Sequence, residues 1–166
     1  FCSHVIVGHS ERRAYYNETD QLINLKIKAA QGQGLVPVLC LGESHQQRES
    51  GQAARVISKQ LQDALGDVEL VDPARIVIAY EPVWAIGSGQ SASPQETNQL
   101  IAQVIRPTLE SLWGNEASQK IRVLYGGSVT AVNAGSFFSQ LEIDGALIGG
   151  ASLSAESFLD IITRAI

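Results

Sequence analysis

Five short apolar runs recur along the chain, and each is nearly continuous and rich in β-branched residues. Such runs are typical of strands that are buried on both faces of a parallel sheet. Pro37 fits near the start of a strand, where its missing N–H does not break the hydrogen-bond ladder. The predicted strands cover residues 4–8, 35–41, 75–80, 121–125 and 144–148.

Segments with the apolar periodicity of amphipathic helices lie between these runs. The clearest helix start is at Ser93, an N-cap followed by Pro94 in the first helical position and by Glu96 in a capping box. That helix is expected to reach about Trp113, with a kink near Pro107. The predicted helices cover residues 20–31, 52–65, 94–113, 130–140 and 154–165.

Strand and helix therefore alternate five times, which predicts an α/β fold with a parallel sheet. Two architectures fit this order: a doubly wound open sheet, or part of a (β/α)8 barrel. A complete barrel of about 250 residues has eight units of roughly 31 residues each. At that size the 166 residues of this chain hold about five units.

Composition excludes several classes of function. The chain is 45% apolar, 17% charged and has a net charge of −5, which argues against non-specific binding to nucleic acid or to an anionic membrane. No apolar run approaches the roughly 20 residues of a membrane span, and a secretory signal pattern is absent from the sequence. Cys2 and Cys40 form neither a CxxC pair nor a disulfide framework, so we expect a cytoplasmic protein.

Glycine-rich turns follow the last two predicted strands, with Gly-Gly-Ser at 126–128 and Gly-Gly-Ala-Ser at 149–152. Their backbone N–H groups can converge on an anion, and a following helix N-terminus adds partial positive charge. Either pair alone is also explained by a tight strand-to-helix turn. Two such pairs at successive strand ends favour a phosphate site.

Two further candidates follow buried strands. Glu81 comes directly after the run 75–80, where burial can raise its pKa and suit it to general-base chemistry, although a structural cap or ion pair is an alternative. His9 ends the first strand, and a structural hydrogen-bond donor is the commoner role for a lone histidine. Because carboxyl ends of parallel strands share one edge, the sequence predicts that both side chains face the same mouth.

Residues 82–89 are apolar at first and end in Gly-Ser-Gly. An apolar loop beside a candidate base is typical of a lid that excludes water on closing. The alternative is a buried loop packed on the helices, which strand-end loops adopt less often.

These motifs, taken in order, resemble the signatures of the triosephosphate isomerase family, and the resemblance covers essentially the whole chain. The stretch from Tyr80 to Gly89 is especially specific. The matching segments are Val-Gly-His-Ser-Glu-Arg-Arg at 7–13, Ala-Tyr-Glu-Pro-Val-Trp-Ala-Ile-Gly-Ser-Gly at 79–89, Tyr-Gly-Gly-Ser-Val at 125–129 and Gly-Gly-Ala-Ser-Leu at 149–153.

The resemblance implies that Glu81 moves a proton between two carbons of glyceraldehyde 3-phosphate and dihydroxyacetone phosphate, through an enediolate. It implies that His9, as a neutral imidazole, polarises the carbonyl and that Glu11 supports the site. It also implies a phosphate site made of Gly87, Ser128, Gly149 and Gly150, with no metal or organic cofactor. These roles follow known behaviour of the family.

The resemblance also implies three preceding strand–helix units that the sequence lacks, and the first of these carries an Asn-x-Lys motif whose lysine contacts substrate. The Asn24-Leu25-Lys26 match lies in a predicted helix and is rejected for that role. Residues 1–166 are therefore expected to be a single, incomplete TIM-barrel domain. Loss of one oxyanion donor typically costs 10²- to 10³-fold in rate, so weak or absent activity is expected.

Five strands do not close a small barrel. We expect two bare sheet edges and a bare inward face on every strand, which favour association. The chain is thus expected to self-associate or to need the missing N-terminal units. The alternative to an isomerase is a non-catalytic partial-barrel module that self-associates or complements an N-terminal fragment.

Overall fold

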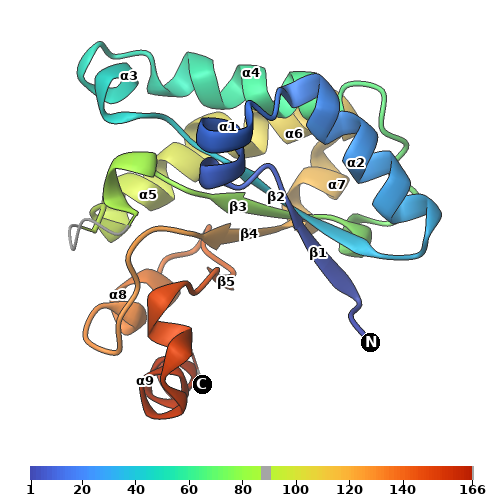
Figure 1. Ribbon diagram of the computed structural model, residues 1–166. Coiled ribbons are helices and arrows are strands. Elements are labelled where there is room, and N and C mark those ends of the chain that lie inside the picture. Colours follow the sequence, from blue (N-terminus) through green and yellow to red (C-terminus); the bar gives the residue numbers. More distant parts are fainter. Residues whose placement is uncertain (87–90, 166) are drawn as a thin grey trace.

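A computed structural model describes residues 1–86 and 91–165 and contains a five-stranded sheet in the order β1-β2-β3-β4-β5 (Figure 1). Every neighbouring pair of strands is parallel. This arrangement confirms the α/β class and the partial (β/α)8 barrel with five strand–helix units. The strands are β1 (His4–Val7), β2 (Val36–Leu41), β3 (Val77–Tyr80), β4 (Arg122–Tyr125) and β5 (Gly145–Ala146).

Helices follow each strand, and in Figure 1 α8 and α9 lie at the β5 end of the sheet, apart from the others. The α-helices are α1 (Ser10–Tyr16), α2 (Asp20–Gly32), α3 (His45–Glu49), α4 (Ala53–Leu65), α5 (Pro94–Leu100), α6 (Arg106–Trp113), α7 (Asn115–Lys120), α8 (Ala134–Phe138) and α9 (Ala155–Ile162). Three 3₁₀ turns and one π-helical segment complete the described elements: η1 (Pro73–Arg75), η2 (Val83–Ala85), η4 (Gly150–Leu153) and the π segment η3 (Ile101–Ile105).

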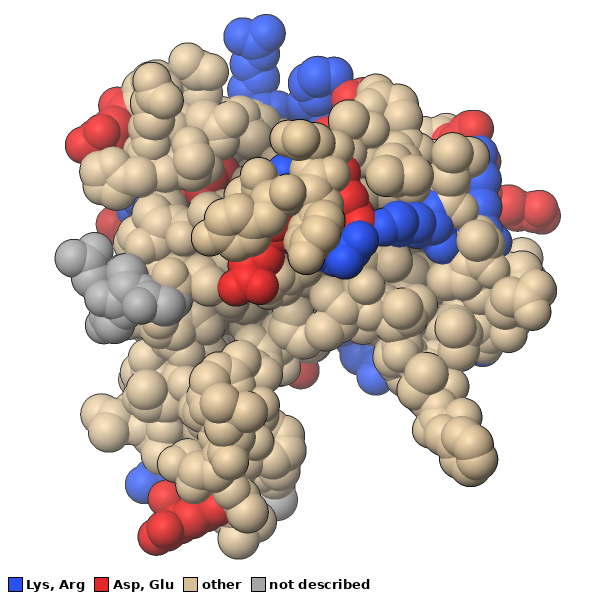
Figure 2. Space-filling view, viewed as in Figure 1, with Lys and Arg blue, Asp and Glu red and all other residues tan. Residues whose placement is uncertain are grey.

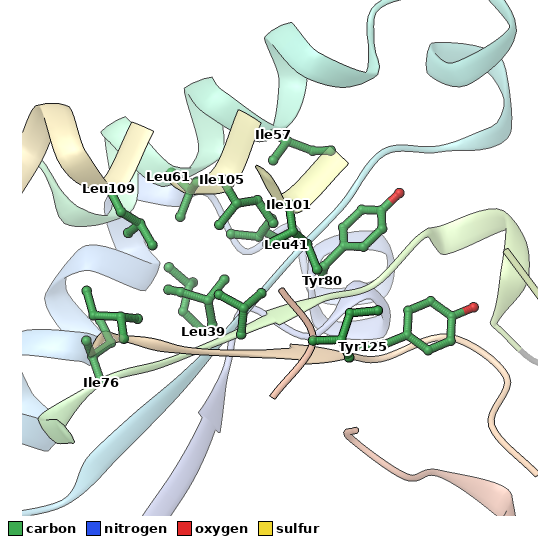
Figure 3. Packing of buried hydrophobic residues seen from close by; sticks show 14 of the residues in the cluster. Leu39, Leu41, Ile57, Leu61, Ile76, Tyr80, Ile101, Ile105, Leu109 and Tyr125 are labelled. Carbon is green, nitrogen blue, oxygen red and sulfur yellow. The ribbon is translucent and has the colours of Figure 1, made fainter. Parts of the chain in front are cut away.

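The main core lies between the sheet and the helices, because alternate strand side chains point to the helix layer. Leu39 and Leu41 of β2 and Tyr80 of β3 pack there against α4, η3 and α6 (Figure 3). The hydroxyl groups of Tyr80 and Tyr125 point out of this cluster, toward the end of the sheet where the strands finish. The core thereby fixes the two residues that directly precede Glu81 and Gly126.

The prediction that the inward face of every strand is bare is wrong for β2 and β3. Val38, Cys40, Val77 and Ala79 are all buried there. The parallel register places Val38 beside Val77 and Cys40 beside Ala79, so these side chains cover one another, with Leu124 and Leu147 packed alongside. The edge strand β1 does keep an exposed inward residue, Ile6, which is 49% exposed.

The predicted long helix is interrupted earlier than expected. The π segment Ile101–Ile105 separates α5 from α6 and ends two residues before Pro107. A proline ring would clash with the carbonyl four residues earlier, at Gln103, and the wider π turn lies at that position. Ser93 does cap α5, but the carboxylate of Glu96 binds Arg48 at 2.8 Å.

Three short helices were not predicted. The sequence predicts a strand-end loop where α1 lies, and its periodicity predicts no helix at α3 or α7. A signal for α3 is present in the sequence, because Ser44 and Gln47 form a reciprocal capping box. α7 begins directly after Gly114, whose positive φ of 86° turns the chain between α6 and α7.

Candidate functional site

A cleft of about 600 Å³ opens beyond the carboxyl ends of the strands. Because all five strands are parallel, the segments that follow them converge on this edge. The space-filling view shows a further hollow, between helices α8 and α9 and the amino-terminal end of β1, with mostly uncharged atoms around it (Figure 2). The sequence-predicted residues His9, Glu81, Ser128, Gly149 and Gly150 all line the cleft.

Glu81 lies at the inner end of the cleft, 2% exposed. Its Oε1 is 3.2 Å from His9 Nε2, and its Oε2 accepts a hydrogen bond of 3.2 Å from the backbone N–H of Ser10. The Glu81 N–H donates to the carbonyl of Leu41 at 2.7 Å, which continues the ladder between β2 and β3. The carboxylate is therefore held by a rigid backbone and by partners from the first strand–helix junction.

Burial raises the pKa of the Glu81 carboxyl, while His9 and the Ser10 N–H oppose that rise. The neighbouring Cys40 thiol also opposes that rise in the pKa of Glu81. Burial and the neighbouring Glu81 raise the pKa of Cys40 itself, so the thiol is a core residue and not a nucleophile. A raised pKa moves a glutamate toward the range in which it can take up and return a proton.

His9 is the N-cap of α1 and presents its two ring nitrogens to different partners. Nδ1 accepts from the Glu11 N–H at 3.4 Å, and Nε2 faces Glu81. A neutral imidazole with its proton on Nε2 satisfies both contacts. The Glu11 side chain is exposed on α1, so its observed link to the site is its backbone N–H.

Two glycines let the backbone approach Glu81 closely. A Cβ on Gly126 would lie 2.7 Å from Glu81 Cγ, and a Cβ on Gly42 would lie 1.8 Å from the Glu81 carbonyl oxygen. Gly127 is similarly confined, since a Cβ there would lie 2.2 Å from the Tyr125 hydroxyl. The glycines after β2 and β4 thus serve close packing around Glu81, which the phosphate interpretation of residues 126–128 did not anticipate.

Ser128 joins this wall to the turn that follows Glu81. Its hydroxyl donates to the carbonyl of Ala85 at 2.7 Å, and its own carbonyl accepts from the Asn133 side chain at 3.1 Å. Gly149 and Gly150 also line the cleft and are exposed; Gly149 precedes the 3₁₀ turn η4, and Gly150 is its first residue. A Cβ on either would meet no described atom within 4 Å, so the space beside these two glycines is open. Gly87, the fourth predicted phosphate ligand, lies outside the described residues.

The predicted lid begins as a packed turn. Ala85 of η2 is fully buried, and the half-buried Trp84 donates from Nε1 to Glu43 Oε1 at 2.9 Å. The Tyr80 hydroxyl reaches the same carboxylate at 3.1 Å. Glu43 is fully buried and was not singled out in the sequence, although its place directly after Gly42 at a strand end was a signal.

The described residues contain no group of three or more His, Cys, Asp or Glu side chains arranged to hold a metal ion. They also contain no helix long and apolar enough to cross a membrane.

Comparison with known proteins bears on the whole chain. The family model described as triosephosphate isomerase matches residues 1–165. The triosephosphate isomerase of Dictyoglomus thermophilum is 50% identical over 161 residues, which are 97% of this chain and 64% of that protein. That of Dehalococcoides mccartyi strain BAV1 is 50% identical over 164 residues, or 99% of this chain and 63% of that protein.

The chain thus spans just under two thirds of the length of these relatives. Within that span the family model and the strand-end motifs coincide, and the cleft brings those motifs together. This chain belongs to the triosephosphate isomerase family.

Proposed function

We propose that the cleft interconverts glyceraldehyde 3-phosphate and dihydroxyacetone phosphate. The observation that carries the proposal is the buried Glu81 carboxylate with His9 Nε2 at 3.2 Å, both at the wall of one cleft. Glu81 takes a proton from the carbon next to the carbonyl and returns it to the neighbouring carbon. A neutral His9 with its proton on Nε2 is suited to donate to the substrate oxygens as the enediolate forms.

The substrate phosphate is proposed to bind the N–H groups of Ser128, Gly149 and Gly150, with Gly87 as a further ligand. The support is that these three described residues line the cleft and that Gly149 and Gly150 leave room around their backbone. Glu11 is proposed to act on His9 through its N–H, which holds the imidazole in the required tautomer.

The described residues that line the cleft include no lysine or arginine. The developing charge of an enediolate would therefore depend on neutral donors. Loss of one preorganised donor typically costs 10²- to 10³-fold in rate. We therefore propose that this chain on its own is a weak isomerase, and that a polypeptide carrying the family's Asn-x-Lys unit raises its activity.

The test is an assay of the purified chain for glyceraldehyde 3-phosphate conversion, with Glu81→Gln as its matched variant. The variant keeps the size and hydrogen bonding of the side chain but removes the base, so activity should fall about 10²- to 10⁴-fold. Equal activity in both preparations would show that the measured turnover comes from a contaminating enzyme. Added N-terminal fragment should increase the activity of the original chain and not that of the variant.

A second candidate is a non-catalytic partial-barrel module that associates with itself or with an N-terminal fragment. The observation in its favour is the exposure of large apolar residues at the β5 end, where Val132 is 94% and Leu153 is 91% exposed. An inactive chain that still binds the fragment would support this alternative.

A further inference from the structure

Arg48 contacts two residues that follow Glu81 in the sequence, Trp84 and Glu96. It lies on α3, whose start is held by the Ser44–Gln47 capping box. Its guanidinium carbon is 4.5 Å from the centre of the Trp84 ring, in stacking distance. Its Nη2 binds Glu96 Oε2 at 2.8 Å, in the first turn of α5.

We propose that Arg48 is a positioning residue for Glu81, acting through a clasp formed by Arg48, Trp84 and Glu96. Trp84 and Glu96 are twelve positions apart in the sequence, and one guanidinium contacts both side chains. The proposal rests on the proposed function, because Glu81 is the base in that reaction. Arg48 does not line the cleft, so it acts without touching substrate.

The path from Arg48 to Glu81 is short and runs through Glu43. The Glu43 carboxylate accepts from Trp84 Nε1 and from the Tyr80 hydroxyl, and Arg48 Nη1 lies 3.8 Å from it. The Glu43 carbonyl also accepts from the Val83 N–H at 3.1 Å. Glu43 therefore holds Tyr80, which precedes Glu81, and both Val83 and Trp84, which follow it. Arg48 supplies a nearby positive charge for the buried carboxylate of Glu43.

The clasp combines two interactions with different chemistry. Stacking on Trp84 needs a flat, weakly hydrated cation, which a lysine does not provide. The pair with Glu96 is exposed to solvent, since the Glu96 side chain is 61% exposed, and salt therefore weakens it. Variants can separate the two: Glu96→Gln removes the ion pair, Arg48→Lys keeps a charge without the flat stack, and Arg48→Met removes both.

The structural test measures acrylamide quenching of Trp84 in a Trp113→Phe background, where Trp84 is the remaining tryptophan. We expect the quenching constant to rise at least twofold in Arg48→Met and by a smaller factor in Arg48→Lys and Glu96→Gln. When Arg48 and Glu96 are both present, quenching of Trp84 should increase with salt, because salt weakens their ion pair. Glu96→Gln should abolish that salt dependence. Arg55→Met is the matched control, because Arg55 is exposed on α4 and forms no ion pair among the described residues.

The kinetic test uses the same variants with the N-terminal fragment present. Misplacing Glu81 should lower kcat about tenfold in Arg48→Met and change KM less than twofold, whereas Arg48→Lys should recover part of kcat. Unchanged quenching and salt dependence in Arg48→Met and Glu96→Gln would overturn the clasp, whether or not the chain is an isomerase. Changed quenching with an unchanged kcat would overturn the positioning role.

If Arg48→Met fails to fold, Arg48→Lys and Glu96→Gln give the same two readouts. If the chain shows no isomerase activity under any condition, the proposed function fails. The quenching measurements then still decide whether the clasp exists.

Discussion

Glu81 combines a hydrophobic setting with a small number of polar partners. It is held between the strand ends by the backbone contacts at Leu41 and Ser10, and its carboxylate is almost fully buried. Burial is the main reason that its pKa is raised. The same property that suits the residue to proton transfer also makes it a source of pH-dependent stability.

The pH dependence has a defined sign. Because the folded chain binds the Glu81 proton more tightly than the unfolded chain, Glu81 stabilises the fold below its ordinary pKa of 4.5, and this stabilisation is lost as the pH rises through the raised pKa. Glu81→Gln does not titrate. The Tm of this variant minus that of the original chain should therefore increase from pH 4.5 to pH 8. Each kcal/mol of unfolding free energy that the original chain loses over this range should add about 2–4 °C to the difference.

Thermal unfolding followed by circular dichroism at several pH values measures this difference. Glu116→Gln is the control, because Glu116 is exposed and Lys120 lowers its pKa, so its trend should be small and opposite. A difference for Glu81→Gln that stays constant or decreases with pH would contradict a raised pKa.

At the scale of elements, the junctions between strands and turns carry the tightest geometry. The loop after β2 and the loop after β3 touch at Gly42 and the Glu81 carbonyl, where a methyl group has no space. Gly126 occupies the matching place after β4, beside the Glu81 side chain. These contacts explain why short loops at the ends of neighbouring strands can place a carboxylate so accurately.

Alanine at Gly42 should therefore destabilise the fold by about 3 kcal/mol, since the backbone must move to accommodate Cβ. Alanine at Gly126 should cost less, because it meets a side chain, and should mainly displace Glu81 and lower activity. Gly135→Ala on α8 is the control: a Cβ there meets no described atom within 4 Å, and helix propensity should add about 0.5–1 kcal/mol of stability. Urea denaturation measures the free energy of unfolding of all three variants. Equal free energies for Gly42→Ala and Gly135→Ala would refute the packing explanation.

At the scale of the whole molecule, the sheet has two edges and an apolar end. β1 and β5 each have a hydrogen-bonded neighbour on one side within the described chain. Three large apolar side chains are exposed in and near helices α8 and α9, namely Val132, Leu153 and Leu159. Although the inward faces of β2 and β3 are covered, these surfaces favour association with a second copy or with further barrel units.

The chain should therefore elute as a species larger than its 17.8 kDa mass in size-exclusion chromatography with light scattering. Leu153→Asp, near the cleft, should reduce association because it places a charge in the apolar surface. Val71→Asp is the control, since Val71 is similarly exposed but lies before β3, at the amino-terminal end of the strands. A single monomer peak for the original chain at micromolar concentration would refute self-association.

The order of strands, the parallel sheet and the residues at the cleft wall were predictable from the sequence, because strand periodicity is local and parallel strands bring their ends to one edge. Glu81, His9, Ser128, Gly149 and Gly150 were found in this way. Their proposed roles remain predictions.

Other features depend on contacts between residues far apart in the chain, and the tertiary structure alone decided them. The contacts of Glu43 and Arg48 join α3, the turn η2 and α5, and the close packing of Gly42 and Gly126 depends on where neighbouring strands end. The inward side chains of β2 and β3 cover one another only because the pairing register places Val38 beside Val77 and Cys40 beside Ala79. Local sequence patterns report which residues are apolar or turn-forming, whereas such contacts depend on the spacing of strands that only the folded chain sets.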